Sequence, residues 1–173
     1  SLILRALDLG ASGVVYPHVD DSDSAAQIVH WSKYRPHGDR GFALYSRAAG
    51  YGAVSAQEHL DNTESSVILV AMLESPSAAA TATEILQVSG IDGYMIGTSD
   101  LAASTGPQDP PMSESVAHIH RSGLTTGVTR FDIVNTVEAA ADARNDGADV
   151  IVYNTTALLR QLFTGLSVVQ ELT

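Results

Sequence analysis

The sequence predicts an α/β fold of the parallel (β/α)8, or TIM-barrel, type, with only about five of the eight β/α units present. Short apolar runs of β type alternate with longer segments of helical period, as βαβ units with parallel strands require. Three of the runs follow a Gly-Ala or acidic-Gly turn, at 10–13, 92–93 and 147–149. Such regular punctuation favours a barrel over a dinucleotide-binding fold, since no G-x-G-x-x-G motif opens a helix.

The first half of the chain predicts two strands and two helices. Residues 13–17 form the first apolar run, and an acidic patch then begins a helical pattern that reaches Trp31. The run 67–73 is apolar throughout, as expected for a strand covered on both faces. Ser75 is the predicted N-cap of the next helix, because Pro76 suits its first position and the apolar stripe continues to near Gly90.

The segment between His37 and Glu64 shows no clear element over roughly 25 residues, which is long for a loop in a compact domain. Such loops are commonly functional or part of an interface. A surface excursion that contains a short helix is the equally weighted alternative. Both interpretations leave the predicted strands on either side of the segment unchanged.

The second half predicts three more strands. Residues 93–96 form a strand that ends at Gly97, and a short helix around 116–122 precedes a fourth strand at 124–128. Asp132 is expected to cap a longer helix, with Gly147 at its C′ position. A fifth strand at 150–153 leads into a last helix with apolar residues over 158–163. We expect one incomplete (β/α) barrel domain over residues 1–173.

Composition excludes several classes of partner and site. The chain has 20 acidic and 9 basic residues, a formal net charge of −11, which argues against nucleic acid as a partner. It contains no cysteine, so disulfides and thiolate metal sites are excluded, and a reducing cytoplasm is favoured. No apolar run approaches the roughly 18 residues of a membrane span, and no signal pattern opens the sequence. We therefore expect a cytoplasmic protein that does not bind a membrane.

Two carboxylates follow predicted strands at the edge where parallel α/β folds gather reactive residues. Glu74 comes directly after the second strand, and Asp100 lies four residues after Ile96. One βαβ unit separates them, so their strands are expected to be neighbours about 4.8 Å apart. A hard cation such as Mg²⁺ or Mn²⁺ could bind there, with water and substrate oxygens as further ligands. Alternatively, both residues merely begin helices, where negative charge is favourable.

The histidines give weaker signals. His18 follows Pro17 at a strand end, on the same edge as the two carboxylates, and a single histidine there is more often a packing or hydrogen-bonding residue. His118 and His120 are two positions apart on a predicted helix and therefore point in different directions. No G-x-S-x-G motif is present to activate a serine nucleophile.

Several short segments, in order along the chain, resemble the HpcH/HpaI aldolase and citrate lyase family of pyruvate/phosphoenolpyruvate-type barrels. The matching segments are Ala6–Val14 leading to Pro17-His18-Val19, the R-P-x-G-x-R-G stretch at 35–41, Leu73-Glu74-Ser75, residues 90–101, and Gly147-Ala148 to Leu158-Leu159. They extend over nearly the whole chain, and their ordered combination is more specific than any one of them.

This resemblance implies a carbon–carbon lyase of the class II aldolase type. Such an enzyme cleaves a 2-oxo acid to pyruvate and an aldehyde through a metal-stabilised pyruvate enolate. Glu74 and Asp100 match the family's Mg²⁺- or Mn²⁺-binding carboxylates after the fifth and sixth barrel strands. The backbone N–H groups of Gly97, Thr98 and Ser99 would position the substrate carboxylate. Related barrels form trimers or hexamers, so a homo-oligomer is implied.

The resemblance also implies that the chain supplies strands four to eight of the barrel and is N-terminally truncated. The family's histidine base and substrate-binding arginine would lie upstream, so no catalytic residue is assigned here. Met72 and Thr98 stand where the family usually has glutamine and proline. A degenerate barrel remnant that binds metal, oxo acid or a partner subunit without catalysis is therefore the alternative. A citrate-lyase-like acyl-CoA lyase is less favoured, because few basic residues are available for CoA phosphates.

Overall fold

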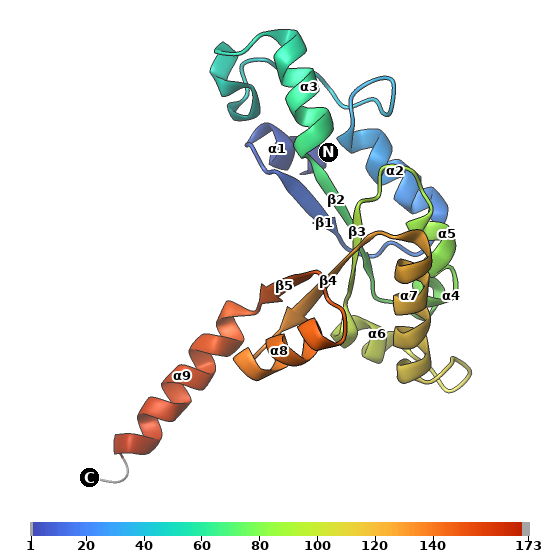
Figure 1. Cartoon of the computed structure of the whole chain (residues 1–173), viewed down its shortest axis with the longest axis vertical. Coiled ribbons are helices and arrows are strands. Elements are labelled where there is room, and N and C mark those ends of the chain that lie inside the picture. Colours follow the sequence, from blue (N-terminus) through green and yellow to red (C-terminus); the bar gives the residue numbers. More distant parts are fainter. Residues whose placement is uncertain (1, 171–173) are drawn as a thin grey trace. The chain divides into compact units, whose positions relative to one another are not determined.

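The computed structural model describes residues 2–170 and has an α/β fold with five parallel strands (Figure 1). The predicted α/β class and the number of strands are confirmed, whereas the eight-stranded barrel type and the assignment of these strands to its positions four to eight stay predictions. The chain divides into two compact units, one ending at Val128 and the other beginning at Thr129. Within the described residues, no helix is long and apolar enough to cross a membrane.

The first unit is built on three parallel strands, β1 (Gly13–Tyr16), β2 (Ile68–Leu73) and β3 (Gly93–Ile96). β2 lies between the other two, and Leu73 at its end is in register with Ile96 of β3. Residues 69–71 and Leu73 are buried, which agrees with the unbroken apolar run of a strand covered on both faces. The predicted strands at 13–17, 67–73 and 93–96 are thus confirmed to within one residue at each end.

The helices of this unit lie in the chain segments before, between and after the strands. In chain order they are α1 (Leu2–Asp8), α2 (Ser22–Ser32), the 3-10 helix η1 (Arg47–Gly52), α3 (Ala56–Ser66), α4 (Pro76–Ala80), α5 (Ala82–Leu86), α6 (Thr98–Ser104) and α7 (Met112–Thr126). Figure 1 shows α2, α4, α5 and α7 along one side of the strands. Leu7, Ile28, Ile85 and Ile119 bring four of these helices into one hydrophobic core with Leu69 of β2.

Helix capping follows the sequence closely in this unit. The Asp21 carboxylate accepts a hydrogen bond from the Ser24 N–H at 2.7 Å and begins α2. The Ser75 hydroxyl accepts from the Ala78 N–H at 3.1 Å, with Pro76 at the first position of α4 as predicted. The single helix expected beyond Ser75 is divided at Thr81 into α4 and α5.

The predicted helix at 116–122 is confirmed in position but is longer than predicted, and the strand predicted at 124–128 is wrong. α7 continues to Thr126, and Gly127, with a φ of 73°, ends it. Gly123 lies within the helix, next to the ring of Tyr94. A Cβ at this position would lie 2.7 Å from the ring carbon Cζ, so the close packing of α7 on Tyr94 requires glycine. The fourth strand accordingly begins later, at Thr129.

The segment between His37 and Glu64 contains more structure than the turn-rich interpretation predicts. η1 and α3 both lie in it, so the alternative with a short helix is the better description. The Ser55 hydroxyl caps α3 by accepting from the Glu58 N–H at 3.2 Å. His59 of α3 is 2% exposed and forms an aromatic cluster with Tyr34 and Phe42, which packs α3 against the rest of the unit.

The second unit consists of β4 (Thr129–Val134), α8 (Val137–Asn145), β5 (Val150–Tyr153) and α9 (Thr155–Gln170). β4 and β5 are parallel, and the strand predicted at 150–153 is confirmed. Asp132 does not cap a helix as predicted. It lies within β4, where the Arg130 guanidinium donates two hydrogen bonds to it, and Thr136 caps α8 instead. Gly147 follows the C-cap of α8 with a φ of 98°, as predicted.

Candidate functional site at the ends of β2 and β3

Glu74 directly follows β2 and is only 4% exposed. Its Oε1 accepts a hydrogen bond from the backbone N–H of His18 at 2.8 Å, and His18 Nδ1 lies 3.0 Å from the same oxygen. Ser75, the next residue, caps α4. Ser75 is therefore the residue that begins the helix. The Glu74 carboxylate contacts His18, which follows the neighbouring strand β1.

The second carboxylate oxygen of Glu74, Oε2, lies against Gly97. The Gly97 N–H donates to the Leu73 carbonyl at 3.1 Å, which continues the pairing of β2 with β3 by one residue. A Cβ on Gly97 would lie 2.6 Å from the Cβ of Glu74 and closer still to Oε2, so only glycine fits there. Among residues 2–170 no group donates a hydrogen bond to Oε2, and this oxygen remains able to take a ligand.

Asp100 lies in the first turn of α6, three residues after Gly97. Its side chain is exposed, as are Thr98 and Ser99 before it, and no side chain caps this helix. The prediction that β2 and β3 are neighbouring strands is confirmed, because Leu73 pairs with Ile96. Glu74, Gly97 and Asp100, which we call the strand-end site, thus lie at the same edge of the sheet.

The donor chemistry of the strand-end site fits a hard divalent cation. Both candidate ligands are carboxylate oxygens, and Mg²⁺ is commonly bound by one or two carboxylates with water and substrate oxygens as the remaining ligands. Over residues 2–170 no three His, Asp or Glu side chains are grouped as a metal site. The two carboxylates therefore fit a site whose other ligands are not side chains of this part of the chain.

His18 lies at the same edge of the sheet, and its contact with Glu74 was not predicted from the sequence. The prediction of a hydrogen-bonding role is confirmed, but its partner, Glu74, was not foreseen. The available signal was its position: it follows β1, and β1 is the other neighbour of β2. The backbone of His18 has a φ of 55°, in the left-handed region that non-glycine residues seldom adopt.

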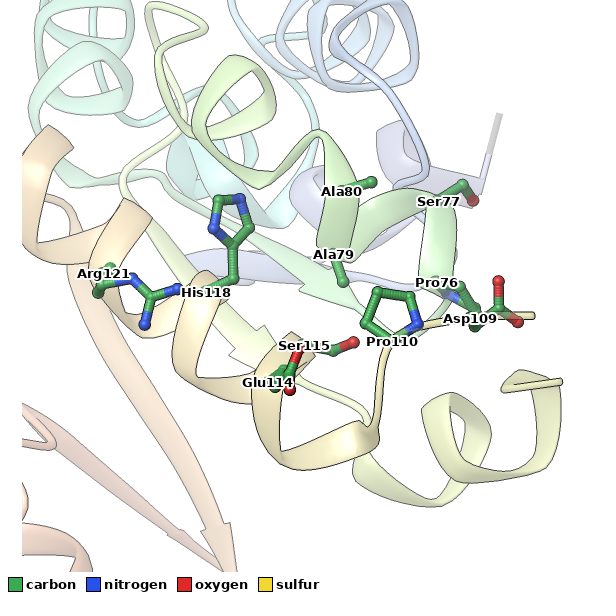
Figure 2. Close-up of a pocket in the computed structure, with 10 residues that line it drawn as sticks. All are labelled: Pro76, Ser77, Ala79, Ala80, Asp109, Pro110, Glu114, Ser115, His118 and Arg121. Carbon is green, nitrogen blue, oxygen red and sulfur yellow. The ribbon is translucent and has the colours of Figure 1, made fainter. Parts of the chain in front are cut away.

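A separate cavity of about 570 Å³ lies between α4 and α7 (Figure 2). Its lining residues are Pro76, Ser77, Ala79, Ala80, Asp109, Pro110, Glu114, Ser115, His118 and Arg121. Glu74, Gly97 and Asp100 are not among them, so this cavity is distinct from the strand-end site. His118 faces it, whereas His120 contacts the Tyr94 hydroxyl at 3.0 Å, and the two histidines point apart as predicted.

Comparison with known proteins gives the same family at the level of sequence and structure. The model of the HpcH/HpaI aldolase/citrate lyase family matches residues 2–156. A 2-keto-3-deoxy-L-rhamnonate aldolase of Escherichia coli O17:K52:H18 (strain UMN026 / ExPEC) is 41% identical over 110 residues, 63% of this chain and 40% of that protein. The chain therefore spans about two fifths of the length of this relative.

Solved structures are similar over nearly the whole chain. An HpcH/HpaI aldolase/citrate lyase family protein from Burkholderia cenocepacia J2315 superimposes with a TM-score of 0.85 and 27% identity, covering 98% of this chain and 69% of that one. A citrate lyase beta subunit from M. tuberculosis, complexed with oxaloacetate and magnesium, gives a TM-score of 0.52 and 16% identity, covering 83% of this chain and 56% of that one. The second likeness shows the fold alone.

Proposed function

Because the chain belongs to the HpcH/HpaI aldolase/citrate lyase family, we propose that it is part of a metal-dependent carbon–carbon lyase that cleaves a 2-oxo acid to pyruvate and an aldehyde. The Glu74 carboxylate carries this proposal. It is almost fully buried at the carboxyl end of a central strand, and one of its oxygens is left without a hydrogen-bond donor among the described residues. Oε2 is not among the side-chain atoms that are sealed from solvent without a partner, so a cation can reach it from outside.

Glu74 and Asp100 are the residues that would hold the metal, with Mg²⁺ or Mn²⁺ as the ions that suit carboxylate ligands. A bound divalent cation supplies Lewis-acid stabilisation of the negative charge that develops on the keto oxygen when the C3–C4 bond breaks. A distant structural relative, the M. tuberculosis citrate lyase beta subunit, is described as complexed with oxaloacetate and magnesium. That chemistry is consistent with the site proposed here.

The loop after β3 is proposed to bind the substrate carboxylate. The first backbone N–H groups of a helix have no partner within the helix and are suited to bind anions. Thr98 and Ser99 begin α6 directly after Gly97, and both are exposed. Their N–H groups, with that of Gly97, would orient a 2-oxo acid such as pyruvate next to Glu74 and Asp100. Among residues 2–170 we assign no general acid or base.

The five strands are further proposed to be strands four to eight of an eight-stranded barrel. The solved Burkholderia relative is matched over 98% of this chain but over only 69% of its own length, which supports an incomplete barrel, and the choice of strands four to eight rests on the family resemblance. Homo-oligomers, trimers or hexamers, are proposed on the basis of the family. A binding remnant without catalysis is the second candidate, favoured by Met72, a side chain that cannot take the hydrogen-bonding role of glutamine near Glu74.

Calorimetric titration with Mn²⁺ tests the metal site. The wild type should bind the ion, and Glu74→Ala and Asp100→Ala should each weaken binding at least about tenfold, since each removes a ligand. Glu84→Ala removes a carboxylate from α5, away from the strand-end site, and should leave the affinity unchanged. Equal Mn²⁺ affinity in the wild type and in both site variants would overturn the proposal.

A further inference from the structure

We propose that His18 is a positioning residue for the strand-end site: it holds one oxygen of Glu74 and thereby presents the other to the metal. This inference rests on the proposed function, because it takes Glu74 as a metal ligand. Its basis is the convergence of the His18 backbone N–H and the ring atom Nδ1 on the same oxygen, Oε1, at 2.8 and 3.0 Å.

The contact has two parts. The backbone N–H of His18 donates a hydrogen bond to Oε1, and the ring atom Nδ1 lies at ion-pair distance from the same oxygen. Together they hold Oε1 in place and restrict rotation of the carboxylate. Oε2, which lies against Gly97, is then the oxygen available to a cation. Hydrogen-bonded partners of this kind commonly orient metal-ligating carboxylates.

The position of the His18 ring is not explained by hydrophobic packing. Its side chain is 72% exposed, whereas the Glu74 side chain is 4% exposed. The contrast with His59 is clear, because that ring is 2% exposed and packs among aromatic side chains. The feature that places this exposed ring is therefore its contact with the buried carboxylate.

The backbone of His18 has a conformation that needs support from its neighbours. A φ of 55° is unfavourable for a residue with a Cβ. The next residue, Val19, is fully buried, and its N–H donates to the Met72 carbonyl at 3.3 Å. Asp20 then accepts from the Ser75 hydroxyl through its carboxylate and from the Thr81 hydroxyl through its carbonyl, the latter at 3.1 Å. These contacts attach the loop to both sides of Glu74 and hold the unfavourable conformation in place.

Three substitutions separate the ring N–H from the backbone conformation. His18→Gly accepts the positive φ but has no side-chain donor. His18→Asn tolerates the same φ and keeps an N–H donor near the place of Nδ1. His18→Leu has neither property. The matched control is His37→Leu, since His37 also lies beside a carboxylate, Glu64, at 3.7 Å, but both side chains are exposed on the surface.

The measurement is the Mn²⁺ dissociation constant of each variant of the whole chain, with thermal unfolding as the control for folding. We expect His18→Gly and His18→Leu to bind Mn²⁺ about 10- to 100-fold more weakly than the wild type, the range typical for lost partners of metal ligands. His18→Asn should recover most of the affinity, and His37→Leu should match the wild type. If only the backbone conformation of the loop mattered, His18→Gly would instead bind Mn²⁺ as tightly as the wild type.

The outcomes separate this inference from the proposed function. Mn²⁺ binding that depends on Glu74 but is unchanged in His18→Leu and His18→Gly overturns the role of His18 alone. Rescue by His18→Gly with no rescue by His18→Asn also overturns it, because the backbone conformation would then be the feature that matters. Mn²⁺ binding that is unaffected by Glu74→Ala contradicts the proposed function itself.

Discussion

Gly97 and Glu74 are packed so closely that the site depends on the absence of a side chain at position 97. The ideal Cβ of any other residue would stand 2.6 Å from the Glu74 Cβ, and the carboxylate oxygen Oε2 lies nearer still. The φ of Gly97 is −81°, so its backbone conformation does not require glycine. The requirement is steric, and it arises from the carboxylate that we propose as a metal ligand.

The substitution Gly97→Ala should therefore displace Glu74. We expect the free energy of unfolding to fall by about 1–3 kcal/mol, as is usual when a well-packed region is overfilled, and Mn²⁺ binding to be lost. Urea unfolding and calorimetry measure the two effects.

Gly123→Ala is the matched control for this prediction. Its added methyl group would meet the Tyr94 ring within the same unit, 2.7 Å from Cζ, and should destabilise the protein by a similar amount. It is remote from Glu74 in the packing of α7 on β3, so Mn²⁺ affinity should be retained in the folded variant. Loss of affinity in Gly123→Ala but not in Gly97→Ala would contradict the steric argument.

The Ser75 hydroxyl connects the first turn of α4 with the loop that contains Asp20. Its removal should therefore lower the free energy of unfolding more than the loss of a helix cap alone. Its hydroxyl accepts from the Ala78 N–H and also contacts the Asp20 carboxylate. We expect Ser75→Ala to lower the free energy of unfolding by about 1–2 kcal/mol, and by more than Ser55→Ala. Ser55 caps α3 of the same unit, with Glu58 as its partner. A larger loss in Ser55→Ala, measured by urea unfolding, would show that the Asp20 contact contributes nothing.

His59 should make the first unit sensitive to acid. Burial, followed by the nearby Arg40 cation, lowers the pKa of His59 below its ordinary value of 6.5, although Asp8 acts in the opposite direction. Nε2 lies 3.0 Å from the Tyr34 hydroxyl, whose own pKa is raised by burial. The folded state thus favours the neutral ring. As the pH falls below about 6.5, the unfolded state binds the proton first and the free energy of unfolding decreases.

The variant His59→Gln isolates this effect, because a glutamine amide can still contact the Tyr34 hydroxyl but does not titrate. Urea unfolding at about pH 7.5 and about pH 5.5 should show a larger loss of stability in the wild type than in His59→Gln. Equal losses in the two proteins would assign the acid sensitivity to other groups.

Much of the fold could be predicted because local signals and packing agree. The strand predicted at 67–73 from its apolar run is observed at 68–73, where Leu69, Val70, Ala71 and Leu73 are buried, and Ser75 caps the next helix as its sequence indicates. The helix predicted at 116–122 was too short, because α7 continues through Gly123, which packs against Tyr94, and ends before Gly127. Asp132 was expected to cap a helix, but its partner is Arg130 of the same strand.

The candidate site could be predicted only in part. Glu74 and Asp100 were found because each follows a strand end directly or within one turn, and the register of β2 with β3 brings these ends together. The contact between His18 and Glu74 joins residues 56 positions apart. It also depends on a left-handed backbone that no residue type at 18 indicates. Contacts of that range are set by the tertiary structure and leave no periodic pattern in the sequence.

The most direct test of the proposed function is proton NMR of pyruvate in D₂O with the full chain and Mg²⁺. The account predicts that the methyl protons exchange with solvent deuterium faster than in the absence of protein. This exchange should stop when Mg²⁺ is removed by a chelator and in Glu74→Ala, and it should persist in Glu84→Ala. A folded wild type that binds metal through Glu74 but leaves the methyl signal unchanged would contradict enolisation of pyruvate by this chain and favour the second candidate, a binding remnant without catalysis.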